Sequence, residues 1–233
     1  MKRNSSSRRK KNTGSGHQVR LACSLVLNAL IVVFTAYSVF LCFYDPASRD
    51  FTANGRYAFR YFTVDSNVFC ALASLLMIVM ELRMLAKGGG LLPKWILLFK
   101  FMGTVTVALT CLTCVFYLSG MLGGFANLIH GKELFMHLLT PVAAALSFVV
   151  FEHGAPLKLW SIFLPVVPVA AYGAVYFYMV LAVPKDHGGW QDVYRLVRNR
   201  DWYTSTLVMF AAVLLICLVL WALHRLFDQI GRK

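Results

Sequence analysis

The chain has 233 residues, of which 59% are hydrophobic and only 14% are charged. A soluble domain usually contains about 25% charged and 45–50% apolar residues, so this composition excludes an ordinary soluble enzyme and a disordered protein. The formal net charge is +13, and seven of the 23 Lys and Arg residues lie within the first 20 positions. The composition indicates a membrane protein whose positive charge is concentrated at its N-terminus.

Six apolar segments are long enough to cross a bilayer, which takes about 20 helical residues. They lie at residues 19–44, 59–85, 94–120, 133–152, 157–182 and 203–227. We therefore predict an all-α, polytopic membrane protein, with a six-transmembrane-helix bundle over residues 19–227. The first segment is too long for a cleavable signal peptide, so we expect an uncleaved helix. Residues 1–18 are predicted to form a disordered basic tail, and residues 228–233 a short C-terminal tail.

The distribution of Lys and Arg predicts the orientation, because cytoplasmic loops carry an excess of these residues. The side of the membrane that holds the N-terminus carries most of the Lys and Arg residues. Without the seven in the first 20 positions, the two sides of the membrane carry equal numbers of them. The basic tail thus predicts that both termini are cytoplasmic, and we expect a plasma-membrane protein. No aromatic residue or motif in the tail favours nucleic acid, so contact with anionic lipid headgroups is the simpler role.

Polar side chains within the predicted spans indicate which face of each helix turns toward the bundle. In the second span they form one stripe at helical spacing: Thr63, Ser66, Asn67, Cys70, Ser74 and Glu81. Most such residues are explained by helix packing, with hydroxyl groups bonded to main-chain carbonyls. The six cysteines all fall inside spans, which is typical of packing thiols rather than of disulfides.

Thr63 and His137 are the strongest candidates for chemistry. Each lies about one turn inside its span on the side away from the termini, which places both roughly 5–8 Å below the same interface. A hydroxyl and an imidazole at one depth are the minimum arrangement for an activated nucleophile. A structural role for the histidine stays open. Pro141 crowds the carbonyl four residues back, that of His137, and so predicts a bend there.

Two motifs carry a resemblance to a known family: RYFTVDSN at residues 60–67 and HLLTP at residues 137–141. They resemble the androgen-induced and androgen-dependent TFPI-regulating protein family, six-span threonine hydrolases that cleave fatty acid esters of hydroxy fatty acids. They also resemble a group of uncharacterised bacterial six-span proteins, to which residues 188–194, GGWQDVY, are more similar. The resemblance implies a nucleophile at Thr63 and a base at His137.

The leading hypothesis is therefore a lipid-ester hydrolase or acyl transferase acting on membrane lipids or fatty acid esters. Asn67, one turn from Thr63, is a candidate donor to a developing oxyanion, with Ser66 beside it. Three residues are candidates for orienting the imidazole: Asp65, Glu133 and Tyr117. No phosphate-binding loop, zinc motif or nucleophile elbow is present, so we expect no cofactor and no metal.

Two other hypotheses stay open: a non-catalytic scaffold or sensor, and a small transporter. The half of the bundle near the termini contains Glu81, Lys100, Glu152 and His224, all close to span ends where long side chains can reach water. That placement predicts no continuous charged path across the membrane and so argues against transport. The sequence leaves the oligomeric state open.

Overall fold

The computed structural model of the chain describes residues 4–44, 52–87, 90–121, 123–197 and 201–231. Within these residues, six helical segments are long and apolar enough to cross a membrane: 18–44, 62–86, 94–121, 131–151, 159–181 and 202–230. The predicted all-α, six-span class is confirmed, and each predicted boundary lies within about three residues of the observed one.

The spans are built from α-helices joined to short 3-10 and π-helical pieces. The α-helices are α1 (Asn4–Tyr44), α2 (Phe62–Ala86), α3 (Lys94–Thr113), α4 (Ser119–Met121), α5 (Gly131–Leu134), α6 (Thr140–Leu146), α7 (Val166–Leu181) and α8 (Trp202–Gly231). Three π-helical pieces continue the third and fourth spans: η2 (Cys114–Leu118), η4 (Phe135–Leu139) and η5 (Ser147–Phe151). The 3-10 helices are η1 (Gly55–Arg60), η3 (Phe125–Leu128), η6 (Leu159–Phe163) and η7 (Lys185–His187).

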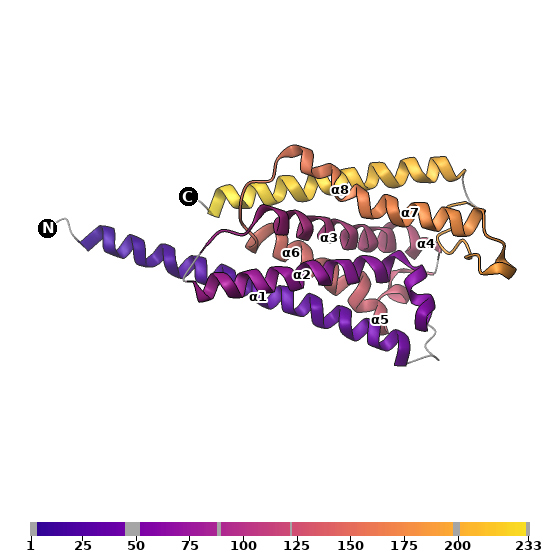
Figure 1. Cartoon of the computed structure of the whole chain (residues 1–233), viewed down its shortest axis with the longest axis horizontal. Coiled ribbons are helices and arrows are strands. Elements are labelled where there is room, and N and C mark those ends of the chain that lie inside the picture. The colour runs from indigo at the N-terminus through magenta and orange to yellow at the C-terminus, as the bar shows by residue number, and fades with distance from the viewer. Residues whose placement is uncertain (1–3, 45–51, 88–89, 122, 198–200, 232–233) are drawn as a thin grey trace.

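Both termini lie at the same end of the bundle, as an even number of spans requires (Figure 1). We call this end the terminal face and the opposite end the far face. α3 packs against α2, α6 and α8, while α1 packs against α2 and α6. In Figure 1, α7 and α8 run along one edge of the bundle and α1 along the other. Residues from α2, α3 and α6 therefore form the centre of the bundle.

The structure differs from the prediction for the two tails. α1 is helical from Asn4, within the segment 1–18 that was expected to be disordered, and α8 continues to Gly231, within the predicted tail 228–233. Neither stretch contains proline, the residue that interrupts a helix most strongly. Residues 1–3 and 232–233 of these tails lie outside the described residues.

A close approach of α2 and α3 sets the position of the candidate residues on α2. A Cβ atom added to Gly103 would lie 3.0 Å from the Cα of Cys70. Small residues of this kind allow membrane helices to pack backbone against backbone. The contact fixes the depth and rotation of α2 about two turns from its far end, where Thr63 lies.

We expect Gly103→Val to destabilise the bundle by about 1–3 kcal/mol, because the added side chain overlaps the backbone of α2. Thermal unfolding of the detergent-purified protein measures this loss. Gly173→Val on α7 is the matched control, because a Cβ there meets no described atom within 4 Å. Equal melting temperatures for the two variants would contradict the close approach of α2 and α3.

Candidate functional site

Thr63 and His137 lie next to each other in the far half of the bundle. The Thr63 Oγ1 is 3.4 Å from the Nε2 of His137, and the two residues are 3% and 0% exposed. A threonine at a helix start often caps it, but the residue in the N-cap position of α2 is Tyr61. The Thr63 side chain is therefore directed at the imidazole rather than at its own helix.

The main-chain carbonyl of Leu128 orients the imidazole. This oxygen, at the end of η3, lies 2.7 Å from the Nδ1 of His137. A carbonyl oxygen can only accept a hydrogen bond, so Nδ1 carries the hydrogen. When the ring is neutral, its lone pair is therefore on Nε2, the nitrogen that faces Thr63.

Glu133 contacts the same nitrogen as Thr63 does. Its Oε2 lies 3.3 Å from the Nε2 of His137, and its Oε1 accepts a hydrogen bond of 2.8 Å from the N–H of Thr52. An orienting carboxylate would instead bind Nδ1, the position that the carbonyl of Leu128 occupies. Glu133 is thus placed to stabilise a charged imidazolium and not to set the tautomer of a neutral ring.

The other two residues considered as orienters do not occupy that position either. Asp65 is half-buried on α2, two residues after Thr63. Tyr117 is 37% exposed, and its hydroxyl donates to the main-chain oxygen of Tyr194 at 3.0 Å. The expectation that one of three side chains orients the ring is therefore corrected, because a main-chain group does so.

Asn67 and Ser66 support the site through the main chain. The Nδ2 of Asn67 donates to the carbonyl oxygens of Thr63 at 2.7 Å and of Met136 at 3.2 Å. The hydroxyl of Ser66 donates to the Thr63 carbonyl at 3.1 Å and lies 2.8 Å from the Thr110 hydroxyl. Both N–H groups of Asn67 are directed at carbonyls, so this amide joins α2 to η4 and has no free N–H for an oxyanion.

The π-helical turn around His137 explains why Asn67 reaches Met136. In a π-helix each N–H bonds to the carbonyl five residues back, as Thr140 does to Phe135. Pro141 has no N–H to offer to Met136, five residues back, and Asn67 donates to that carbonyl instead. The helix is thus irregular beside Pro141, where we predicted a bend. The carbonyl that receives a side-chain donor is that of Met136, and not that of His137.

Tyr194, which follows the fifth span, also reaches the site. Its hydroxyl oxygen accepts a hydrogen bond of 2.9 Å from the N–H of Phe62. Burial raises the pKa of the Tyr194 phenol, and hydrogen bonds involving Tyr172, the Phe62 N–H and Thr63 act in the opposite direction. The phenol therefore stays protonated near pH 7 beside the Thr63 hydroxyl. Sequence analysis did not identify this residue, because nothing in the sequence places it near α2.

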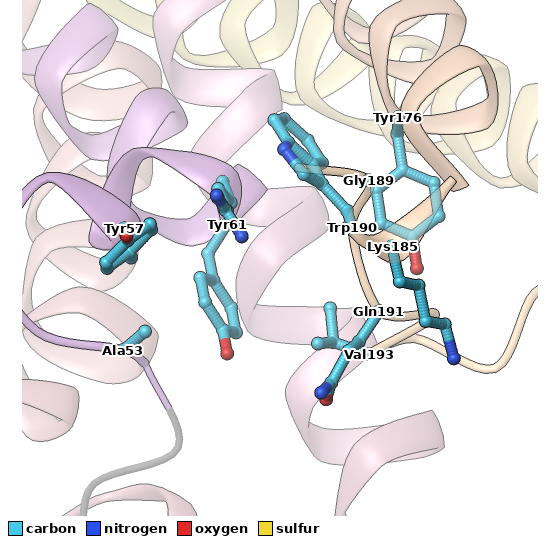
Figure 2. A pocket seen from close by; sticks show the side chains of 10 residues that line it. Ala53, Tyr57, Tyr61, Tyr176, Lys185, Gly189, Trp190, Gln191 and Val193 are labelled. Atoms are coloured by element: carbon cyan, nitrogen blue, oxygen red, sulfur yellow. The ribbon is translucent and has the colours of Figure 1, made fainter. Parts of the chain in front are cut away.

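A cavity of about 360 Å³ opens beside the start of α2 on the far side. Figure 2 shows the side chains of Tyr57 and Tyr61 facing Trp190 and Val193 across it. Arg60 and Lys185 add positive charge to this aromatic lining. The Arg56 guanidinium lowers the pKa of the exposed Tyr57 phenol by hydrogen bonding, and Arg60 acts in the same direction. On the segment that leads into α2, the last residue to line the cavity is Tyr61, two residues before Thr63.

No protein-family model, curated protein or solved structure matches this chain. Among the described residues, no group of three or more His, Cys, Asp and Glu side chains could hold a metal ion. The groups that the structure brings together at the site are the Thr63 hydroxyl, the His137 ring, the Glu133 carboxyl and the Tyr194 phenol.

The half of the bundle near the termini differs from expectation. Glu81, Lys100 and Glu152 are at most 1% exposed and His224 is 3% exposed, so none of these side chains extends to water. They face the bundle, where they bond to one another, to polar residues of α1 and to the main chain. The expectation that these side chains reach water near the span ends is therefore wrong.

Histidine-selective ¹⁵N NMR of the protein in lipid tests the geometry around His137. We expect the neutral ring to carry its hydrogen on Nδ1, because that nitrogen donates to the carbonyl of Leu128. The signal is assigned by its loss in His137→Gln, and His187, whose side chain is 77% exposed, supplies the reference for a ring in contact with water. A neutral ring with its hydrogen on Nε2 would contradict the arrangement.

Proposed function

We propose that this protein is an intramembrane lipid-ester hydrolase or acyl transferase, with Thr63 as nucleophile and His137 as general base. The observation that carries the proposal is the 3.4 Å contact between Thr63 Oγ1 and the Nε2 of His137. The Nδ1–H of the same ring is engaged by Leu128, so Nε2 is the nitrogen that accepts a proton. The motifs around both residues, which resemble those of six-span threonine hydrolases, support the same assignment.

In the first half of the reaction, Nε2 of His137 takes the proton of the Thr63 hydroxyl as its oxygen attacks the ester carbonyl. The negative charge that develops on the carbonyl oxygen is stabilised by the Tyr194 phenol, a protonated donor beside Thr63. The imidazolium is stabilised by Glu133, whose Oε2 lies 3.3 Å from Nε2. The C–O bond then breaks, and the imidazolium returns its proton to the leaving alkoxide.

In the second half, the same ring removes a proton from water or from an acceptor alcohol. The resulting nucleophile attacks the acyl-threonine, and the Thr63 oxygen leaves with the proton held on His137. Water as acceptor makes the protein a hydrolase and an alcohol makes it a transferase. Asn67 takes no part in proton transfer, and it positions the nucleophile by holding the carbonyls of Thr63 and Met136.

The substrate in this proposal is a long-chain ester that enters from the membrane. The pair lies about one turn below the far face, and the helices around it expose large apolar side chains to the surroundings. The cavity at Tyr57, Tyr61 and Trp190 opens close to the start of α2, and its aromatic lining suits an ester at the interface. With both termini in the cytoplasm, this opening is in the outer leaflet of the plasma membrane.

A non-catalytic scaffold is the second candidate. Thr63 and His137 are almost completely buried and each is hydrogen bonded, as a purely structural contact would be. In that case, replacing either residue lowers stability, and the wild-type protein has no reactive threonine.

Labelling with a fluorophosphonate probe separates the two candidates. We expect the probe to bond covalently to Thr63, Thr63→Ser to keep labelling, and Thr63→Ala to abolish it. His137→Ala should slow labelling by about 10²–10⁴, the usual contribution of a general base. Tyr194→Phe should slow it by about 10²–10³ if the phenol supports the oxyanion.

Thr206→Ala is the matched control, because the Thr206 hydroxyl donates only to the main-chain oxygen of Trp202 in the described structure. Melting temperatures of all variants are measured together with labelling. An unlabelled wild type combined with an unstable Thr63→Ala variant supports the scaffold. Undiminished labelling of a folded Thr63→Ala variant overturns the nucleophile.

Substrate chain length tests entry from the membrane. We expect hydrolysis of a series of esters presented in mixed micelles to increase with acyl length, because longer chains partition into the bilayer beside the site. The rates are measured at equal total ester concentration, with Thr63→Ala as the background. A preference for short water-soluble esters would contradict this route.

A further inference from the structure

A second buried polar cluster lies in the terminal half of the bundle, and the proposed ester chemistry does not use it. Its members come from α1, α2, α3 and the end of the fourth span: Ser24, Asn28, Ser74, Glu81, Lys100, Ser147 and Glu152. Each of these residues is at most 1% exposed. An apolar layer separates this inner cluster from Thr63 and His137: Ile31, Cys70, Val107, Ala143 and Ala144.

Lys100 is the fixed positive charge of the inner cluster. Its Nζ donates to Asn28 Oδ1 and to Ser74 Oγ, both at 2.7 Å, and lies 3.6 Å from Glu152 Oε1. Three oxygen atoms thus surround an ammonium group that has three hydrogens to donate. This environment holds the side chain in its charged form.

Glu152 is the anionic partner of Lys100. Its Oε1 accepts hydrogen bonds from Ser147 Oγ at 2.6 Å and from Asn28 Nδ2 at 2.9 Å. Donors directed at one carboxylate oxygen, together with a neighbouring ammonium, stabilise the ionised form. Lys100 and Glu152 therefore form a neutral pair, and no positive charge is left over for another acid.

Glu81 is the second acid of the inner cluster, and its environment is different. Its Oε1 accepts a hydrogen bond from Ser24 Oγ, whereas its Oε2 has no hydrogen-bond partner among the described residues. The residue is 1% exposed and lies five residues before the end of α2. An ionised carboxylate here would leave a net negative charge in a buried, apolar setting, which is strongly unfavourable.

Among the side chains that the structure describes, the charged groups of α1 and α8 near this end do not supply the missing positive charge. On α1, the charge of Arg20 interacts with Asp228 of α8. On α8, the ring of His224 contacts the main-chain oxygen of Glu152 at 2.8 Å. The Nδ1 of His153 lies 3.7 Å from Asp228 Oδ1, and both side chains are partly exposed.

We propose that Glu81 is a proton-binding site of this protein, which exchanges a proton with water at the terminal face. The carboxyl holds the proton at neutral pH. Its O–H bond breaks when water takes the proton, and the carboxylate then accepts from Ser24. About five residues separate Glu81 from the end of α2, which corresponds to roughly 7–8 Å. The path to water is therefore short on this side, whereas the apolar layer closes the other.

The chain contains three glutamates, Glu81, Glu133 and Glu152, so carboxyl-selective ¹³C NMR of glutamate-labelled protein in lipid gives three side-chain signals. We expect the Glu81 signal to have the chemical shift of a neutral carboxylic acid at pH 7, where an exposed glutamate is ionised. It should move to the carboxylate position as the pH is raised. The Glu152 signal should stay at the carboxylate position throughout.

Glu81→Gln assigns the signal and mimics the protonated form, and Glu133→Gln is the matched control at the other buried site. Infrared spectra in D₂O should show the carboxylic acid band of the wild type shifting within minutes, and this shift should be absent in Glu81→Gln. Three results would each overturn the proposal. They are a Glu81 signal at the carboxylate position at pH 7, an acid band that survives in Glu81→Gln, and an acid band that does not shift in D₂O. Displacement of the proton by added Na⁺ at constant pH would also overturn it, because the site would then bind metal cations.

Discussion

Hydrocarbon offers no hydrogen bonds, so each polar side chain in a membrane helix needs a partner inside the protein. This constraint governs the arrangement of the bundle. The polar stripe of α2 faces α1, α3 and the fourth span, and these elements supply its partners from Thr63 at one end to Glu81 at the other. The rotation of α2 about its axis is therefore fixed by chemistry as well as by packing, and both buried clusters depend on it.

The far cluster contains one acid and the terminal cluster contains two, and their charge balances differ. At the far side, Glu133 and Thr63 both contact the Nε2 of His137. The Glu133 carboxyl is therefore placed to stabilise a proton that the ring takes up. In the terminal half, Lys100 neutralises one acid and leaves the other to hold its own proton. An apolar layer of five side chains lies between them, which lets one cluster change its protonation without a direct path to the other.

Much of this arrangement follows from the sequence. Length and hydropathy predicted the six spans, and helical spacing together with depth placed Thr63 and His137 at one level. The parts that could not be predicted depend on contacts between distant segments. A main-chain carbonyl such as that of Leu128 leaves no mark in the sequence, and Tyr194 reaches α2 only because of how the chain folds back after the fifth span. Lys100 is near a span end, where snorkelling is common, and it is held inside by partners from α1, α2 and the end of the fourth span.

The π-helical turn at Phe135–Leu139 has a consequence for how the fourth span tolerates changes in length. A π-turn contains one residue more than the α-helical path it replaces, so deleting one residue there would restore ordinary winding. Side chains on both sides of the deletion would then keep their directions, because the wider π-turn takes up the extra residue within one turn. Glu133 and Glu152 would each stay directed at its own polar cluster. The same deletion in a regular α-helical stretch would instead rotate all following side chains by about 100°.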